Sequence, residues 1–454
     1  MSTTPSTSAP TSIYLAGNFG PVSNEVTDTD LTVTGTLPPE LDGRYVRNGP
    51  NPVAPTEPYH WFTGNGMVHG LRMAGGRAQW FRNRWVRDDT VTTFKGWPTT
   101  PGPRHGMGPG VANTNVIGHA GRTYAIVEAG GLPVELSDEL ETIAMSDFDG
   151  TLDGSFSAHP KRDPATGELH TVTYYWEWDH LRYVVVGVDG KVRRTVRVPV
   201  PGRPMTHDCH ITDSYVLLFD LPCQFDLDEA MAGQPFPYHW DPGYQARVGL
   251  LPREGEATEV RWVELEQCFV YHPLNAYDLD DGRVVLDACR HDKTFDQDRL
   301  SPSEGKPTLD RWLLDPATGR SSRTTLSQRM QEFPRHDERI LGRRHRYGYT
   351  VGFSGSDGGV DEYGGILKHD VEGGTTESWD PGRGRSCQEA VFVPAAPDSA
   401  EDDGWLMSYT YDAADDSSSV VVLHAQDIAA GPVAEVHLPQ RVPFGFHGNW
   451  IPTA

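Results

Sequence analysis

The sequence predicts an all-β fold made of many short strands, and three observations support it. Short runs rich in β-branched and aromatic residues recur, each bounded by Gly, Pro, Asn or Asp. Turn pairs such as Asp189-Gly190 and Asp281-Gly282 stand between these runs and indicate hairpins. The 454 residues include 48 Gly and 36 Pro, which implies many turns and disfavours long helical bundles. A sandwich, a barrel and a propeller all fit, and a propeller is favoured because radial blades avoid long exposed edges.

The expected elements follow in chain order. Residues 1–12 lack the basic and apolar regions of a signal peptide, so we expect a disordered N-terminal tail there. No convincing linker divides the remainder, so residues 13–454 are expected to form one propeller domain. Residues 226–231 (DLDEAM) predict a short capped helix, and the acidic residues 397–404 predict a loop tip. The clearest expected strands are residues 122–128, 182–188, 214–220, 283–288 and 419–423.

Composition excludes several classes of protein. The chain has 39 Lys and Arg against 63 Asp and Glu, a formal net charge of −24, which disfavours nucleic acid and anionic membrane surfaces as partners. The five cysteines are scattered and form no CxxC pair, so a disulfide framework is not expected and a reducing compartment fits. No apolar run approaches the ~20 residues of a membrane-spanning helix. We therefore expect a soluble, cytoplasmic protein without a transmembrane segment.

Histidine is the most informative residue type, with 18 in the chain. Most are expected at the surface or in hydrogen-bonded turns. Four stand out at strand ends or turns: His159 in AHPK, His207 in MTHD, His272 in HPLNA and His447 in FGFHG. Successive separations of 48, 65 and 175 residues exclude a local metal motif. These side chains can meet only in a closed fold, for instance on the axis of a propeller.

Local motifs offer weaker alternatives. His207 and His210 form an HxxH pair, but residues i and i+3 of a strand face opposite sides, so the two are not expected to share a metal. No HExxH, phosphate-binding loop or GxSxG elbow occurs in the chain.

Three carboxylates lie in apolar or tightly turned contexts: Glu128, Glu332 and Glu389. A buried carboxylate needs a partner, and for any single Glu an Arg or a backbone N–H is the commoner one. The sharper interpretation is that these residues accept hydrogen bonds from the free ring N–H groups of metal-bound histidines.

These residues, with the segments around them, resemble the carotenoid cleavage oxygenase family, which includes carotenoid, apocarotenoid and stilbene cleaving enzymes. The resemblance covers nearly the whole chain. Its segments are residues 14–21 (YLAGNFGP), 37–50 (LPPELDGRYVRNGP), 60–70 (HWFTGNGMVHG) and 446–450 (FHGNW). It implies a seven-bladed β-propeller whose loops and short helices cap an axial iron site.

The resemblance also implies roles for individual residues. One Fe²⁺ per chain would be held by His159, His207, His272 and His447. The supporting carboxylates would pair as Glu128 with His207, Glu332 with His272 and Glu389 with His447, leaving His159 without one. Thr114, fourteen residues before Glu128, would lie beside an open coordination position used by O₂.

The implied reaction inserts O₂ across a conjugated C=C bond of a small hydrophobic alkene, an apocarotenoid or carotenoid, and gives two carbonyl products. Neutral imidazoles suit ferrous iron, and open positions suit an oxygenase. One alternative is cleavage of a stilbene or aryl-alkene of the vinylphenol or isoeugenol type. Stilbene-cleaving members have Lys where this chain has Val127, which disfavours that alternative. Another is a propeller that binds a partner without catalysis.

A second departure from the family pattern is Ala390 after Glu389, where Pro is usual, which weakens the predicted support of His447. Aromatic residues near the motifs are candidate walls of a substrate tunnel, although each could instead pack a blade core. The candidates are Trp61, Phe62, Trp85, Phe94, Trp97, Phe236, Tyr238 and Trp240, with Val127 beside them. Peripheral contact with a membrane during substrate uptake is a further expectation.

Overall fold

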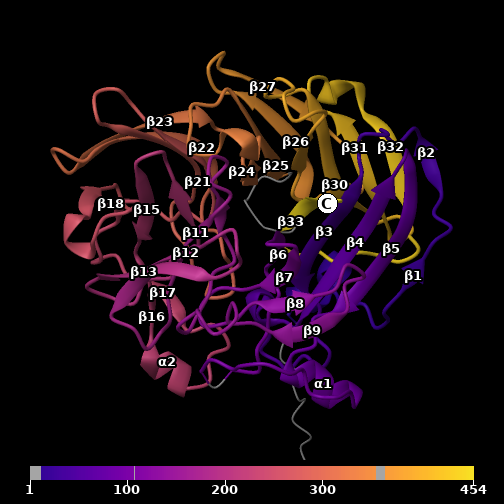
Figure 1. Ribbon diagram of the computed structural model, residues 1–454, viewed down its shortest axis with the longest axis horizontal. Coiled ribbons are helices and arrows are strands. Elements are labelled where there is room, and N and C mark those ends of the chain that lie inside the picture. The colour runs from indigo at the N-terminus through magenta and orange to yellow at the C-terminus, as the bar shows by residue number, and fades with distance from the viewer. Residues whose placement is uncertain (1–11, 107, 354–362, 454) are drawn as a thin grey trace, which may run out of the picture.

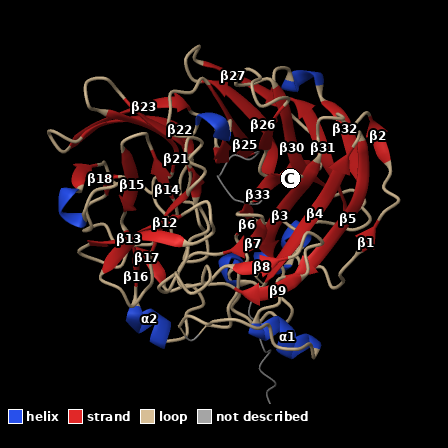
Figure 2. Cartoon of the chain, viewed as in Figure 1, coloured by secondary structure: helices blue, strands red, loops and turns tan. Residues whose placement is uncertain are grey.

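The computed structural model describes residues 12–106, 108–353 and 363–453. Seven of the eight sheets in the described residues are arranged as blades around a central axis, as Figure 1 shows, and Figure 2 shows that helices are few and short. The predicted all-β class and seven-bladed propeller are confirmed. No helix in the described part of the chain has the length and apolar character needed to cross a bilayer.

Four central blades are simple meanders of consecutive or nearly consecutive strands. The second blade has β6 (Asn115–His119), β7 (Arg122–Ile126), β8 (Val134–Leu136) and β9 (Thr142–Met145); the third has β10 (Lys161–Arg162), β11 (Leu169–Thr173), β12 (His180–Val186) and β13 (Val192–Pro199). The fourth has β14 (Cys209–Ile211), β15 (Tyr215–Asp220), β18 (Arg247–Pro252) and β19 (Arg261–Glu264); the fifth has β20 (Pro273–Asp278), β21 (Val284–Arg290), β22 (Thr308–Asp315) and β23 (Arg320–Ser327).

The remaining blades complete the ring. The sixth has β24 (Gln331–Arg335), β25 (Tyr347–Phe353), β26 (Tyr363–Asp370) and β27 (Thr375–Trp379). The seventh has β28 (Arg385–Cys387), β29 (Val391–Pro394), β30 (Gly404–Asp412), β31 (Ser417–His424), β32 (Pro432–His437) and β2 (Val33–Gly35). The first has β33 (Gly448–Pro452), β3 (Gly43–Pro50), β4 (Gly66–Ala74), β5 (Arg77–Trp85) and β1 (Thr27–Asp28).

Segments from both ends of the sequence close the ring. β33 pairs with β3 in the first blade, with Trp450 opposite Tyr45, and β2 pairs with β32 in the seventh. These two strand pairings cover sheet edges that would otherwise be open.

Burial along the strands follows the sequence pattern. The run in β12 is buried on both faces from Leu181 to Val186, whereas β13 alternates exposed and buried residues near the rim. The predicted strands correspond to β7, β12, β15, β21 and β31, and these predictions are confirmed. Of the predicted loop tip, residues 397–403 lie in the connection between β29 and β30, and Gly404 begins β30.

Loops and short helices form a cap on one side of the ring. It contains the β16 (Cys223–Phe225) and β17 (Tyr238–Trp240) pair. The predicted helix is α2 (Leu227–Met231), capped by the Asp226 carboxylate. A second helix that sequence reasoning missed, α1 (Asp89–Lys95), begins at the Asp88 cap and ends at Gly96, whose φ of 67° favours glycine.

Short 3₁₀ turns complete the elements. They are η1 (Ile13–Leu15), η2 (Gly17–Phe19), η3 (Trp61–Thr63), η4 (Ala257–Glu259), η5 (Glu338–Ile340) and η6 (Ile428–Ala430). Of the predicted tail, residues 1–11 lie outside the described residues. Ser12 belongs to the folded domain, because its buried hydroxyl donates to the Tyr59 carbonyl and its amide donates to Glu57.

Candidate metal centre and its two cavities

The inner strand of every blade brings one candidate residue to the propeller axis. Each of the four histidines lies one or two residues before an inner strand. Thr114, Glu332 and Glu389 lie in or next to the inner strands of the other three blades. The seven residues are Thr114 before β6, His159 before β10, His207 before β14, His272 before β20, Glu332 in β24, Glu389 after β28 and His447 before β33. Glu128 follows β7 instead. The long separations in the sequence thus correspond to one residue per blade.

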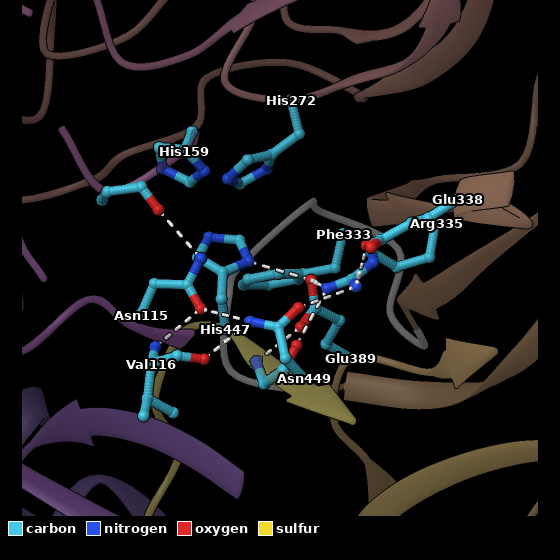
Figure 3. A network of polar contacts seen from close by, with 12 residues as sticks. Asn115, Val116, His159, His272, Phe333, Arg335, Glu338, Glu389, His447 and Asn449 are labelled. Atoms are coloured by element: carbon cyan, nitrogen blue, oxygen red, sulfur yellow. Dashed lines mark hydrogen bonds and ion pairs between the residues drawn. The ribbon is translucent and has the colours of Figure 1, made fainter. Parts of the chain in front are cut away.

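The four histidines converge into one buried cluster. Each offers a ring nitrogen, and the four nitrogens all lie within 4.8 Å of one another. The Nε2 atoms of His207 and His272 are 3.1 Å apart. All four residues are buried, at most 8% exposed. Figure 3 shows His159, His272 and His447 from close by, with their rings turned toward a common point.

Three of the histidines are oriented by carboxylates through the other ring nitrogen. Nδ1 of His207 lies 2.7 Å from Glu128, and Nδ1 of His272 lies 2.6 Å from Glu332. Nδ1 of His447 lies 2.9 Å from Glu389. Each contact leaves Nε2 directed to the centre of the cluster. The structure therefore brings together the three pairs that the resemblance implied.

His159 has a different environment. Its Nδ1 is 3.7 Å from the carboxylate of Asp208, which is itself 2.8 Å from the Lys161 ammonium. Its Nε2 is buried and has no hydrogen-bond partner among the described residues. A buried nitrogen without a partner is costly, and a cation at the centre of the cluster would satisfy it.

The electrostatics fit a metal cation. Burial lowers the pKa of His272 to about 3, and burial together with the neighbouring histidines holds the pKa of His159 well below its usual range. Burial alone would raise the pKa of Glu389, but Arg335 and His447 outweigh it and lower the pKa to about 2. Neutral imidazoles backed by ionised carboxylates are a donor set that binds divalent transition metals.

The backbone at two of the carboxylates is constrained. Ala129, directly after Glu128, has a φ of 58°, and Phe333, directly after Glu332, has a φ of 53°. Left-handed conformations are uncommon for such residues and persist only where surrounding structure holds them. Phe333 then stacks on His272, with ring centroids 5.4 Å apart.

Glu389 is held by a polar network instead. Figure 3 shows Arg335 beside it, with a nitrogen 3.3 Å from the carboxylate. Arg335 also donates to the Gly448 carbonyl and pairs with Glu338. The Gly448 N–H donates to the second oxygen of Glu389 at 2.8 Å. Ala390 replaces the usual Pro, yet the carboxylate still reaches His447.

Two cavities meet at the cluster. An apolar cavity of about 230 Å³ borders His207, His272 and His447. A polar cavity of about 700 Å³ borders His159, His272 and His447 and is lined by Arg, Lys, Asp and Glu side chains. The two share only His272 and His447, so the cluster separates them.

Several predicted tunnel residues line the apolar cavity. They are Trp61, Phe62, Val127, Phe236 and Tyr238, and Thr114 lies there too. An outer cavity of about 370 Å³ adjoins it and shares Phe62, Thr63, Val127, Glu128 and Ala129. Val127 therefore lies where the two spaces join.

Four predicted tunnel residues are placed elsewhere. Phe94 is 57% exposed on α1 and lines neither space, because the helix turns it outward. Trp240 is buried in the hydrophobic core next to β16. Trp85 is buried in the core beneath α1, and its indole N–H donates to the Asn51 carbonyl. Trp97 packs against that same core.

Sequence reasoning missed several wall residues. The apolar cavity is also lined by Tyr174, Tyr271, His291, Ser303, Phe333, Phe353 and Phe446. Phe446 belongs to the FHGNW segment and could have been included on that ground. His291 carried no signal, because its role depends on Glu332: its Nε2 lies 2.9 Å from the carboxylate oxygen that His272 does not use.

Comparison with known proteins agrees with this geometry. The family model described as retinal pigment epithelial membrane protein matches residues 19–452. The carotenoid cleavage oxygenase of Mycobacterium tuberculosis is 46% identical, over 97% of each chain. Carotenoid 9,10(9',10')-cleavage dioxygenase 1 of Phaseolus vulgaris is 34% identical, over 96% of this chain and 89% of that one.

A solved structure supports the same conclusion. The crystal structure of Pseudomonas brassicacearum lignostilbene dioxygenase matches with a TM-score of 0.89 and 29% identity, over 98% of this chain and all of that one. A propeller with four converging histidines defines a class of non-haem oxygenases. The chain belongs to the carotenoid cleavage oxygenase family. The predicted family and enzyme class, an oxidoreductase that incorporates O₂, are confirmed.

Proposed function

We propose that this protein is a non-haem Fe(II) dioxygenase that cleaves a conjugated C=C bond of an apocarotenoid or carotenoid with O₂, giving two carbonyl products. The observation that carries the proposal is the position of the four-histidine cluster at the inner end of an apolar cavity. Family membership supports the reaction class.

The proposed iron ligands are His159, His207, His272 and His447. The unpartnered Nε2 of His159 and the facing Nε2 atoms of His207 and His272 support this assignment. Iron bound there would supply the activation of O₂. The three carboxylates fix the ring orientations and balance charge from a distance.

The rest of the site would position the alkene and exclude water. Trp61, Phe62 and Phe236 form an aromatic wall suited to a conjugated chain. We assign Thr114 to the O₂ side of the site, because it is 6% exposed, lines the cavity and its carbonyl accepts a hydrogen bond from the His447 N–H at 3.0 Å.

The apolar Val127 at the junction of the two spaces favours a polyene. A specific observation also favours a second candidate, an aryl-alkene or stilbene, since the solved lignostilbene dioxygenase matches 98% of this chain with a TM-score of 0.89. A non-catalytic scaffold is the third, from a different class.

A substrate panel separates these candidates. Iron-loaded protein is incubated aerobically with an apocarotenal, β-carotene, a 4-hydroxystilbene and a vinylphenol, and aldehydes are identified by mass spectrometry. We expect aldehydes from the polyenes, and their masses locate the cleaved bond. Hydroxybenzaldehyde products alone contradict the polyene assignment. Turnover that survives complete iron removal contradicts an iron-dependent oxygenase.

We also propose a cytoplasmic location, which all five cysteines support by being free and buried. Peripheral contact with a membrane would use the exposed apolar residues of the cap, Phe94 on α1 with Leu227 and Met231 on α2. Sedimentation with neutral lipid vesicles tests this contact, and Met231→Glu should weaken it.

A further inference from the structure

The polar cavity connects solvent with the histidine cluster. Its lining includes Asp138 and Glu139, whose side chains are 89% and 65% exposed, and also His159, His272 and His447 at the buried end. The apolar cavity reaches the same cluster between aromatic side chains, where a divalent cation would lose its hydration without finding replacement ligands. The two cavities are therefore unequal as routes for a metal ion.

The cationic side chains of the polar cavity are mostly neutralised by carboxylates. The pairs are Arg44 with Asp138, Arg72 with Asp42, Arg122 with Glu135, Lys161 with Asp208, and Arg335 with Glu338. Arg162 instead donates to the Gly118 carbonyl and to Nδ1 of His119. Because the whole chain carries a formal net charge of −24, its long-range field favours the approach of cations.

Two histidines outside the cluster also line the polar cavity, His210 and His336. They are 1% and 6% exposed. Nε2 of His336 is buried and has no hydrogen-bond partner among the described residues. Nδ1 of His210 lies 2.9 Å from the Ile211 carbonyl, which can only accept, so Nδ1 holds the proton and Nε2 keeps a lone pair. Each residue thus has a ring nitrogen that the protein itself does not use.

Both of these histidines are neutral, which is the form that binds a metal. Burial, helped by Lys161, lowers the pKa of His210 to about 3. Burial, with His345 and His210 nearby, holds the pKa of His336 well below its usual range. The ring centroids of His210 and His336 lie 6.3 Å apart, whereas neighbouring rings in the four-histidine cluster lie 4.5–5.3 Å apart. The wider spacing suits weaker, temporary binding.

The cluster is least constrained on the side that faces the polar cavity. His159 lines the polar cavity and not the apolar one. Its Nδ1 is 3.7 Å from Asp208, beyond hydrogen-bond distance, whereas the other three rings are held by carboxylates. The His159 ring can therefore turn aside without breaking such a bond.

We propose that the divalent metal reaches the four-histidine cluster through the polar cavity, and that His210 and His336 bind it in transit. The inference rests on the ligand set of the proposed function. A transit ligand speeds loading but is not part of the loaded centre. Its loss should therefore slow metal uptake and leave the final metal content unchanged.

Metal uptake kinetics test the proposal. Metal-free protein is mixed with Fe²⁺ under anaerobic conditions, unbound metal is removed by rapid gel filtration at set times, and protein-bound iron is measured by mass spectrometry. We expect His336→Leu to load about tenfold more slowly than the unchanged protein, with the same final iron content. The double variant His210→Leu, His336→Leu should load more slowly still.

His119→Leu is the matched control. His119 lines the same cavity, but its Nε2 donates to the Gly187 carbonyl at 2.8 Å and its Nδ1 accepts from Arg162 at 3.1 Å, so neither nitrogen is left for a metal. This variant should load at the rate of the unchanged protein.

The unchanged protein gives a second test that needs no substitution. An apocarotenal bound in the apolar cavity, with binding verified by tryptophan fluorescence, should not slow iron uptake. Uptake blocked by the apocarotenal overturns the proposal, as do equal loading rates in the His336→Leu and double variants. A lower final iron content in His336→Leu also overturns it. An unchanged protein that takes up no iron contradicts the proposed function instead.

Discussion

The two cavities that meet at the histidine cluster differ in chemistry although one ring of strands builds both. On the apolar side, Glu332 is held by a second histidine, His291, and by a constrained Phe333. On the polar side, Glu389 is held by Arg335 and a backbone N–H. Both carboxylates orient a histidine of the same cluster. The comparison shows that the carboxylate that orients a histidine can be held without an Arg or Lys beside the alkene, as His291 and the Phe333 N–H do for Glu332.

Loss of a histidine shared by both cavities should have the largest effect. His272→Ala is expected to abolish iron binding and turnover, because the three remaining histidines leave the metal without its fourth nitrogen ligand. Metal content by mass spectrometry and turnover with an apocarotenal are the measurements. His437→Ala, a surface histidine bonded to Thr34, is the control and should leave both unchanged. Near-normal turnover of His272→Ala removes the four-histidine assignment.

Neutralising each carboxylate sharpens the comparison. Glu332→Gln should reduce turnover or iron affinity by about 10–100-fold with a small change in stability, because its side-chain partners among the described residues are the histidines His272 and His291, with no Arg or Lys paired to it. Glu389→Gln should in addition lower the free energy of unfolding by roughly 2 kcal/mol, since it removes one of the carboxylate partners of the partly buried Arg335.

Denaturant unfolding and turnover are measured on both carboxylate variants. Equal losses of unfolding free energy in Glu332→Gln and Glu389→Gln would contradict the expected contribution of the Arg335–Glu389 ion pair to stability.

Introducing a cationic side chain into the apolar cavity should weaken its preference for polyenes. Val127→Lys is expected to lower polyene turnover about tenfold, because an ammonium would be desolvated at the junction with the outer space. It should also raise activity on phenolic alkenes. Val127→Met adds length without charge and serves as the control. Kinetics with an apocarotenal and a 4-hydroxystilbene are the readout, and unchanged selectivity would contradict a role for this position.

The smallest effect is expected away from both cavities. Burial would raise the pKa of Asp163, but Arg253, 2.5 Å away, outweighs it and lowers the pKa to about 2. A pKa depressed in the folded state adds stability above about pH 4 that is lost as pH falls toward 2. Asp163→Asn should therefore be less stable than the unchanged protein at pH 6, with a smaller difference at pH 3, measured by denaturant unfolding.

The axial histidines could be predicted because each sits in a short, distinctive segment just before an inner strand, and the roles of the carboxylates followed from the resemblance to the family. The residues that line the apolar cavity were harder to predict from the sequence. Phe62 and Phe94 look alike as aromatic residues near motifs, yet one faces the cavity and the other faces solvent, since a missed helix carries Phe94. The role of His291 arises from a single oxygen of Glu332, a contact between the residue that follows β21 and strand β24 that no local sequence pattern indicates.

The closure of the ring by β33 has a consequence for assembly. His447 directly precedes that strand, so the last residue of the proposed metal centre arrives with the strand that seals the first blade. In chain order, the other three histidines are synthesised well before it. A nascent or truncated chain lacking β33 holds three imidazoles around an open axis. If the proposed ligand set is right, metal capture requires the completed fold, because an unfinished chain would lack one of the four proposed ligands.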